Sequence, residues 1–306
     1  MTVQTTTVAK PARSRADTPF RRITRQFFEN RLAVLGLIIL VVLTVPSFLA
    51  PWVAPQNPYD IGTLDIFDSQ LPPLSTSSSG DITYWLGTDG QARDVLSAIL
   101  YGMRTSLIVA FSAVAGALFI GTAVGIIAAY FGGVVDAILM RMVDIQLSFP
   151  AILVALVLLS VLGQGIDKVI IALIVVQWAY FARTARSSAI VERNREYVLA
   201  ARSLSLGSRR IMFRHMLPNT MPPLIVIATI DLAHAITAEA TLSFLGIGVP
   251  VTEPSLGMLI ANGFEFMMSG EYWISLFPGI ALTLIVLGIN LVGDHLRDIL
   301  NPRNAQ

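Results

Sequence analysis

Six long apolar segments, separated by polar stretches, recur along the chain. They cover residues 32–50, 106–131, 137–162, 169–183, 221–245 and 274–292, of which 169–183 is the shortest. A helix that crosses a bilayer needs about 20 mostly apolar residues, so each segment is a candidate span. The segments lack the alternation of polar and apolar positions that lipid-facing barrel strands show. The pattern therefore predicts an all-α membrane protein with six transmembrane helices.

Composition agrees with this class. The chain is 54% hydrophobic and 13% charged, and its mean hydropathy is +0.69, values outside the range of ordinary soluble domains. The first apolar segment starts about thirty residues in and is followed directly by Pro51, which favours an uncleaved anchor over a signal peptide. Because the chain has no cysteine, disulfides, thiolate metal sites and thiol catalysis are excluded.

The basic residues indicate which side of the membrane each loop occupies. With both termini in the cytoplasm (N-in/C-in), seven basic residues fall in the N-terminal tail, one at Arg141, eight between Arg183 and Arg214, and two near the C-terminus. Only Arg93, Arg104 and Lys168 remain outside, as the positive-inside rule requires. We predict this orientation in a cytoplasmic membrane.

The spans divide the chain into four parts. Residues 1–31 form a cytoplasmic basic tail with an amphipathic lead-in, whose arginines lie against anionic headgroups. Residues 32–50 form the first anchor, 51–105 an external loop, and 106–306 a core of five spans with a cytoplasmic loop at 187–218. The external loop is proline-rich and carries Asp60, Asp65, Asp68 and Asp81. It is interpreted as a solvated linker, or alternatively as an acidic contact surface for an outside partner.

Two features concern helix packing. Small residues repeat every four positions in the second span, at Ala113, then at Ala117, Gly121, Gly125 and Ala129. Small residues at this spacing let another helix approach closely within a membrane, so we expect this stripe to pack inside the bundle. Pro150 is expected to kink the third span.

The polar stretch 192–218 is rich in arginine and lies between two spans. It is predicted to form two short helices, 196–204 and 209–217, joined by a turn at Ser205 and Gly207. The adjacent Ala200 and Ala201 leave an unobstructed patch that could enter a groove of a soluble partner. The alternative is an amphipathic helix that lies on lipid.

Four stretches resemble one transporter family. EYVLAARSL followed by a turn and RRIMFRHMLPN is similar to the EAA loop, the ATPase-docking segment of binding-protein-dependent ABC importer permeases. The stretches 86–107, 239–249 and 290–303 resemble the peptide/nickel branch, and the last resembles its C-type permease. The resemblance assigns coupling to Glu196, Tyr197, Ala200, Ala201, Ser205, Gly207, Arg210, Arg214, Leu217 and Pro218.

The resemblance also implies a type I (MetI-like) importer fold and several partners. These are a B-type permease, two ATP-binding subunits that carry ATP and Mg, and an extracytoplasmic binding protein, beside membrane lipid and without nucleic acid. The implied cargo is di- or oligopeptides, although relatives carry nickel chelates, glutathione or opines. Five residues depart from the family pattern. Ser205 and Ala92 stand where glycine is expected, Leu256 where tryptophan is, and His295 and Asn301 where glycine and aspartate are.

Ionisable residues inside a membrane are costly and so are candidates for function. Asp231 and His234 are three apart and could pair on one helix face, while Glu239 lies nearer the outer end. We expect these three as candidates for the translocation path. The alternatives are an internally satisfied pair that fixes packing, and for Glu239 a structural acceptor of hydrogen bonds. Arg141 and Asp144 are expected to form a local i,i+3 ion pair.

Other function classes are disfavoured. The chain has no phosphate-binding G-x-x-x-x-G-K-[ST] loop, so ATP hydrolysis requires another polypeptide, and the chain itself is expected to bind no cofactor. Its three histidines lie on different segments without a hydrolase motif or a metal-binding spacing, so we predict no catalytic residue and no metal site. An ATP-independent channel or carrier remains the second alternative.

Overall fold

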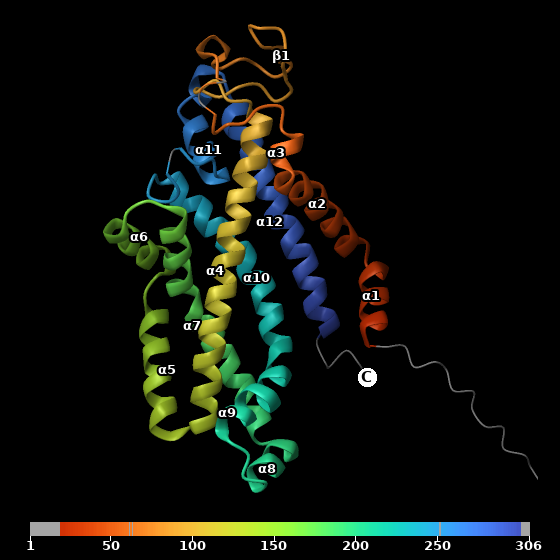
Figure 1. Ribbon diagram of the computed structural model, residues 1–306, viewed down its shortest axis with the longest axis vertical. Coiled ribbons are helices and arrows are strands. Elements are labelled where there is room, and N and C mark those ends of the chain that lie inside the picture. Colours follow the sequence, from red (N-terminus) through yellow and green to blue (C-terminus); the bar gives the residue numbers. More distant parts are fainter. Residues whose placement is uncertain (1–18, 61, 63, 251, 301–306) are drawn as a thin grey trace, which may run out of the picture.

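The computed structural model describes residues 19–60, 62, 64–250 and 252–300. Most of the basic tail and the C-terminal residues Asn301 and Arg303 lie outside these ranges. Figure 1 shows an elongated helical bundle, with loops and a small hairpin at one end and α8 at the other. The main helices are α1 (Pro19–Glu29), α2 (Arg31–Phe48), α4 (Val95–Phe131), α5 (Gly133–Ser148), α6 (Ala151–Leu162), α7 (Ile166–Arg193), α8 (Glu196–Ser203), α10 (Leu217–Phe244), α11 (Leu256–Phe264) and α12 (Trp273–Leu300).

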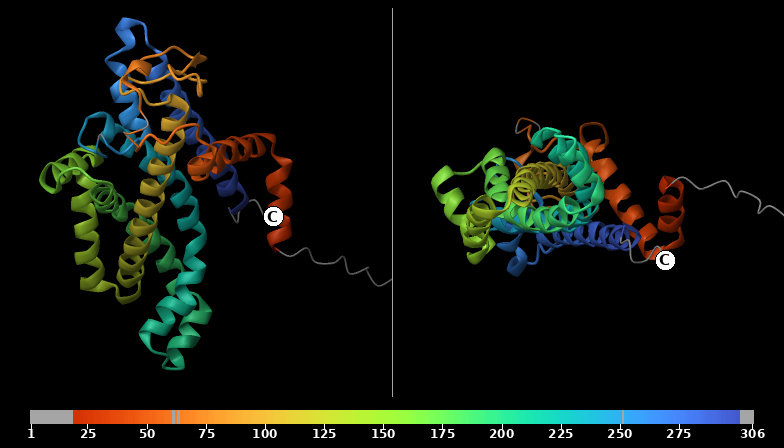
Figure 2. Two further views of the ribbon diagram at one scale, coloured as in Figure 1. Left: turned by 45° about the horizontal axis from the view of Figure 1, so that its top comes forward. Right: turned by 90° about the horizontal axis from the view of Figure 1, so that it is seen from below.

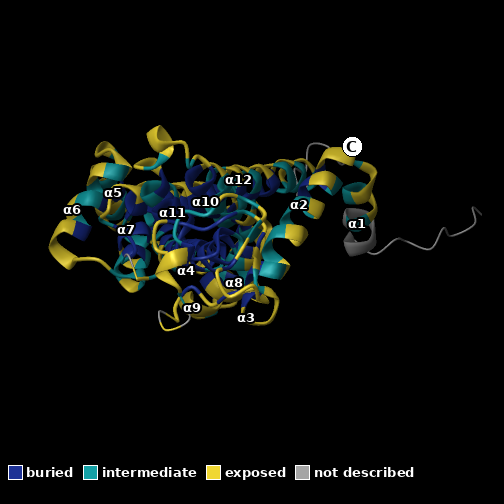
Figure 3. Ribbon diagram, turned by 90° about the horizontal axis from the view of Figure 1, so that it is seen from above, coloured by how far each residue is buried: buried dark blue, intermediate teal, exposed yellow. Residues whose placement is uncertain are grey.

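Short elements complete the described part of the chain. They are α3 (Ala50–Val53), η2 (Ile66–Asp68), β1 (Ser75–Thr76), β2 (Thr83–Tyr84), α9 (Ser208–Arg210), the π-helical turn η3 (Ile211–Met216) and η4 (Met267–Ser269). Figure 3, seen from the outer end, places α5 and α6 at one side, α1 and α2 at the other, and α4, α10 and α12 between them.

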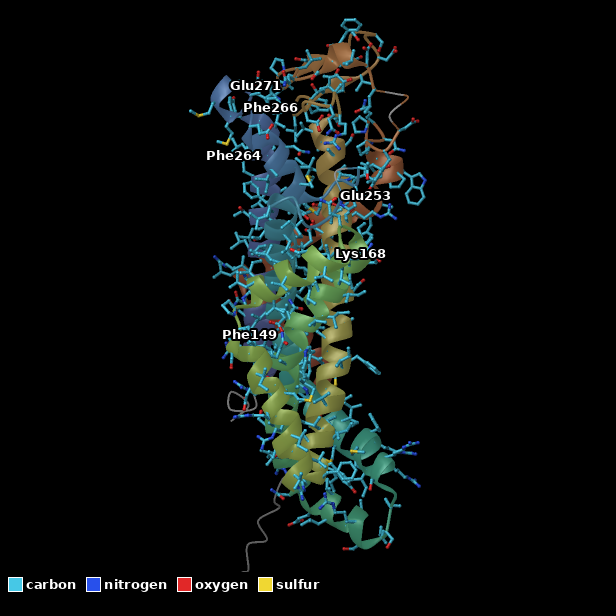
Figure 4. The ribbon with its side chains drawn as sticks, turned by 90° about the vertical axis from the view of Figure 1, so that its left-hand side faces the viewer. Phe149, Lys168, Glu253, Phe264, Phe266 and Glu271 are labelled. Carbon is cyan, nitrogen blue, oxygen red and sulfur yellow. The ribbon has the colours of Figure 1, made fainter. Side chains whose placement is uncertain are left out.

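Among the described residues, five helices are long and apolar enough to cross a membrane: α2, α4, α7, the continuous helix Ser208–Phe244, and α12. The sixth predicted span, 137–162, is instead two helices, α5 and α6, that meet at 90°. Pro150 explains the break, because it has no N–H for the helical ladder and holds Phe149 in an extended conformation (ψ 142°). Figure 4 shows Phe149 at this bend, below Lys168 at the start of α7.

Two spans are much longer than their apolar segments. α4 begins at Val95 rather than residue 106, because the Asp94 carboxylate caps it by accepting from the Ser97 N–H at 2.8 Å. Helix α7 runs on to Arg193, ten residues past the predicted end. Its arginines stay helical because they pair with α5: Arg186 makes two contacts of 2.5 and 2.6 Å with Asp136.

The second pair between α5 and α7 corrects a prediction. Asp144 binds Arg183 at 2.5 Å, rather than its expected local partner Arg141. Asp144 can reach Arg183 because α5 lies beside the inner half of α7 and runs antiparallel to it, as Figure 2 illustrates.

The α4–α7 contact forms the centre of the bundle. A Cβ added to Gly121 would lie 2.5 Å from the Phe181 Cβ, and one added to Gly125 would lie 2.6 Å from the Ala185 Cβ. Ala117 and Ala129 on the same face of α4 are fully or almost fully buried. The structure therefore places the small-residue stripe against α7, where only small side chains permit this approach.

The described residues between α2 and α4 form a folded segment, which we call the cap, and not a solvated linker. Asp68 is buried and accepts a hydrogen bond of 2.9 Å from the Tyr84 hydroxyl, and this contact together with burial raises the pKa of Tyr84. Asp89 and Arg93 form a buried ion pair at 2.7 Å. The Trp273 indole donates to the Thr88 carbonyl at 3.2 Å, which ties the cap to α12. The cap thereby holds the outer ends of α4 and α12 together.

Candidate coupling surface and translocation face

Helix α8 is mounted on the inner ends of three long helices. Its first turn carries Glu196 and its last turn Arg202, the arrangement that the helix dipole favours. Val198 and Ala201 are buried in one cluster with Ile211, Met212 and Met216, and with residues of α4 and α7 (Ile126, Ala129 and Ala189). Because this cluster joins α8 to all three helices, a force on α8 is transmitted to the inner ends of α4, α7 and the helix that becomes α10.

Polar contacts reinforce the same junction. The Tyr197 hydroxyl donates to Glu192 at 2.5 Å and accepts from the Asn219 amide at 3.0 Å. Burial, followed by the hydrogen bond to Glu192, raises the pKa of Tyr197 to about 12. The Arg202 guanidinium stacks over the Tyr130 ring at 4.9 Å. These contacts cross from α8 to α7, α10 and α4.

The turn after α8 has a defined geometry. The Leu206 N–H binds the Ala201 carbonyl at 3.2 Å, and the Ser205 N–H binds the Arg202 carbonyl at 2.9 Å. This is the Schellman pattern, whose left-handed residue is usually glycine. Ser205 takes that position with φ 55°, whereas Gly207 has φ −57° and begins the next helix. Ser205 therefore occupies the left-handed turn position at which the family pattern has glycine. Gly207 does not take over this role.

The predicted second helix of the loop is not separate. α9, η3 and α10 form one continuous helix from Ser208 to Phe244. Pro218 therefore lies inside this continuous helix, where the π-helical turn η3 ends just before it and the chain changes to α-helical geometry.

The outward side of this junction carries exposed apolar and exposed basic side chains. Ala200 points outward, while Ala201 is buried and Leu217 is half-buried. Leu204 is 74% exposed, and Leu199 and Phe213 are also exposed. Arg209, Arg210 and Arg214 are exposed in the same stretch of the chain. We call these exposed residues of 199–214 the coupling surface, since exposed apolar side chains beside charged ones are typical of an interaction site.

Sequence reasoning missed the three large apolar members of the coupling surface. Leu199, Leu204 and Phe213 resemble ordinary helix residues in the sequence. Only their place in the sequence could have indicated that they are exposed. Leu199 stands one residue before the outward Ala200, and Leu204 lies directly before the turn. The remaining predicted residues, Glu196, Tyr197, Ser205, Gly207 and Pro218, are all exposed.

A polar stripe runs along α10. His234 Nδ1 lies 3.6 Å from Asp231 Oδ1, and the His234 side chain is 72% exposed while that of Asp231 is 12% exposed. Thr237 and Thr241 are exposed three and seven residues after His234, which places them on the same helix face. Sequence reasoning missed these threonines, although their spacing was visible. The stripe gives the bundle one polar, open face at membrane depth.

Glu239 has a different environment. It is fully buried and accepts hydrogen bonds from the Ser106 hydroxyl at 2.6 Å and the Ser243 hydroxyl at 2.8 Å. The Ser106 oxygen also lies 3.4 Å from the Leu256 N–H. Through these contacts Glu239 connects α10 with α4 and the start of α11, and it does not share the open stripe.

Two family models match the chain. Residues 121–306 match the binding-protein-dependent transport system inner membrane component model, and residues 18–73 match the N-terminal TM domain of oligopeptide transport permease C. The chain belongs to the first of these families. It is accordingly a multi-pass inner-membrane transporter component and not an enzyme, and the expected membership is confirmed.

Individual relatives agree over nearly the whole length. The chain is 36% identical over 288 residues to the dipeptide transport system permease protein DppC of Alkalihalophilus pseudofirmus, covering 94% of this chain and 91% of that one. It is 37% identical to the DppC of Haemophilus influenzae, covering 94% and 96%. A putative peptide transport system permease protein of Brucella abortus is 39% identical, covering 91% and 90%.

A solved structure confirms the predicted fold. A chain of the MetNI methionine ABC transporter, in an inward-facing conformation, superimposes with a TM-score of 0.54 at 20% identity, covering 67% of this chain and 97% of that chain. The all-α, MetI-like permease fold is thus shown, and the part of the chain that the structure describes contains five helices long enough to span a membrane and one bent pair.

Proposed function

We propose that the chain is the C-type permease of an ABC importer that moves di- or oligopeptides inward across the cytoplasmic membrane. It pairs with a B-type permease, receives cargo from an extracytoplasmic binding protein, and docks two ATP-binding subunits that hold ATP and Mg. The observation that carries the proposal is the coupling surface, an exposed apolar patch whose buried side is joined to three long helices. Peptide cargo is supported by the names of the relatives that cover most of the chain.

The mechanism follows from the mounting of α8. When the ATP-binding subunits close on ATP, they displace the coupling surface, and the buried junction of Val198, Ala201 and Met216 moves the inner ends of α4, α7 and α10 with it. A displacement at the inner end tilts α4, whose outer end is held by the cap, together with α7 and α10, so the open face of α10 changes its access. Such coupling requires that the ATP-bound partner prefer one of the two permease conformations.

The first experiment tests docking. Leu204→Asp places a charge on an exposed side chain, so the permease should keep its fold but lose co-purification of the ATP-binding subunits and ATP-dependent uptake. Leu74→Asp is the matched control, since Leu74 is an exposed leucine in the cap at the other end of the molecule. If the Leu204→Asp permease still retains its ATP-binding partners and transports normally, the coupling surface is not the docking site.

The second experiment tests energy source and cargo. Proteoliposomes that contain the whole transporter should accumulate a labelled dipeptide only with ATP and binding protein present. Uptake without ATP would support the alternative carrier. No accumulation of the labelled dipeptide, together with ATP-dependent accumulation of a labelled nickel chelate, glutathione or opine, would assign the same machinery to one of those cargoes.

A further inference from the structure

An apolar groove lies at the outer end of the molecule, between α2, α4 and α12. Its volume is about 540 Å³, and its lining includes Val42, Pro46, Trp85, Leu100, Met103 and Ile280. Every side chain that lines it is a valine, leucine, isoleucine, alanine, proline, methionine, phenylalanine or tryptophan. We call this feature the outer groove. It shares no lining residue with the coupling surface or the polar stripe of α10.

The groove opens in the part of the molecule that lies within the membrane. Its walls come from three candidate spans: the second half of α2, the first turns of α4 and the first turns of α12. These ends lie on the side of the cap, opposite α8 (Figure 1). Trp52 is 80% exposed just past the end of α2, and Trp85 is 60% exposed at the groove itself. Exposed tryptophans are typical of the bilayer interface, so the groove begins at the outer headgroup level and continues toward the acyl chains.

The packing of α2 explains why a space is left. α2 approaches α12 closely nearer its inner end, where a Cβ on Gly36 would lie 2.7 Å from the Leu291 Cβ and one on Gly288 would lie 3.0 Å from Leu40. In the outer half, the same two helices carry larger residues at the facing positions, among them Val42, Phe277 and Ile280. Pro46 also interrupts the hydrogen bonding of α2 at this level.

We propose that the outer groove binds an acyl chain of an outer-leaflet phospholipid. The lining offers dispersion contacts and no charged or hydroxyl-bearing side chain, which suits a hydrocarbon chain that needs no hydrogen bond. A bound chain fills the gap between the anchor helix α2 and the core, and thereby fixes the position of α2.

The test uses the complete transporter, purified in mild detergent and examined by native mass spectrometry for retained phospholipid. Val42→Trp fills the groove from an exposed position, and Val41→Trp is its control, since both are exposed valines of α2 but only Val42 lines the groove. Wild type and Val41→Trp should retain a phospholipid that Val42→Trp has lost. Equal retention by all three proteins, or no retention by wild type, overturns the proposal.

A second measurement identifies what occupies the groove. In vesicles of phosphatidylcholine with brominated acyl chains, the fluorescence assigned to Trp85, by difference from Trp85→Phe, should be strongly quenched in the wild type and less quenched in Val42→Trp. Absence of that quenching overturns the proposal. A photo-reactive residue at position 42 that cross-links to the second permease chain instead of to lipid also overturns it.

Discussion

The Asn30 Nδ2 atom lies 3.1 Å from the His295 Nδ1 atom, so two residues 265 positions apart meet at the inner side of the bundle. His295 Nε2 lies 3.2 Å from the Gln26 carbonyl oxygen. Because a carbonyl oxygen only accepts, Nε2 carries the proton and Nδ1 accepts from the Asn30 amide. The Asn30 Oδ1 meanwhile caps α2 by accepting from the Leu32 and Ala33 N–H groups. One imidazole thus attaches α1 and the start of α2 to α12.

His295→Ala should release α1 from α12. Two hydrogen bonds of about 1 kcal/mol each are lost, so amide exchange in residues 24–30 should accelerate by roughly tenfold or more. Hydrogen–deuterium exchange on the purified transporter measures this directly. Asp294→Ala, at the adjacent exposed position, is the control and should leave the exchange unchanged. Unaltered exchange in His295→Ala would mean that other contacts hold α1.

Ser205→Gly should stabilise the coupling loop. A residue other than glycine in the left-handed region costs about 1–2 kcal/mol, and Ser205 has φ 55°. Part of this gain is offset by the greater freedom of glycine in the unfolded chain, which leaves roughly 1 kcal/mol or less. Thermal unfolding of the purified complex measures the difference.

Gly207→Ala is the control for this substitution. Gly207 has φ −57°, and a Cβ there would meet no atom within 4 Å, so alanine should be tolerated without loss. The opposite ranking, with Gly207→Ala destabilising and Ser205→Gly neutral, would place the strained turn residue at position 207.

The sequence indicated the bundle, the coupling loop and the packing stripe because each follows from local pattern. Apolar length located the spans, but it ended α7 at Arg183, since charged residues count against a span even where Asp136 and Asp144 of another helix neutralise them. The expected local pair of Arg141 and Asp144 was wrong because Arg183 of α7 pairs with Asp144 instead. The left-handed conformations of Ser205 and Ala92 (φ 62°) were foreshadowed only by family glycines at those positions. The burial of Asp68 depends on Tyr84, a contact between loop residues that no periodicity encodes.

Gly121→Ala should destabilise the core of the bundle. The added methyl group would overlap the Phe181 Cβ and the backbone of α7, and overpacking of this kind costs about 1–3 kcal/mol. Gly279→Ala is the matched control, because a Cβ at Gly279 of α12 would meet nothing within 4 Å and alanine favours the helix. Thermal unfolding in detergent should therefore show a lower midpoint for the first variant only. Equal midpoints would show that α4 and α7 can separate without loss.

The open pair Asp231 and His234 and the enclosed Glu239 should respond differently to substitution. Because His234 is exposed on the polar stripe, Asp231→Asn combined with His234→Ala should alter the KM or the range of cargo while the thermal midpoint stays near that of wild type.

Glu239→Ala leaves the buried hydroxyls of Ser106 and Ser243 without their acceptor, at a cost of about 1–3 kcal/mol each. Its main effect should therefore be on the thermal midpoint. Uptake assays with a panel of peptides, run beside thermal unfolding, separate the two effects. An unchanged KM and cargo range in the double variant would remove the pair from the translocation path, and an unchanged midpoint in Glu239→Ala would remove Glu239 as the link between α10, α4 and α11.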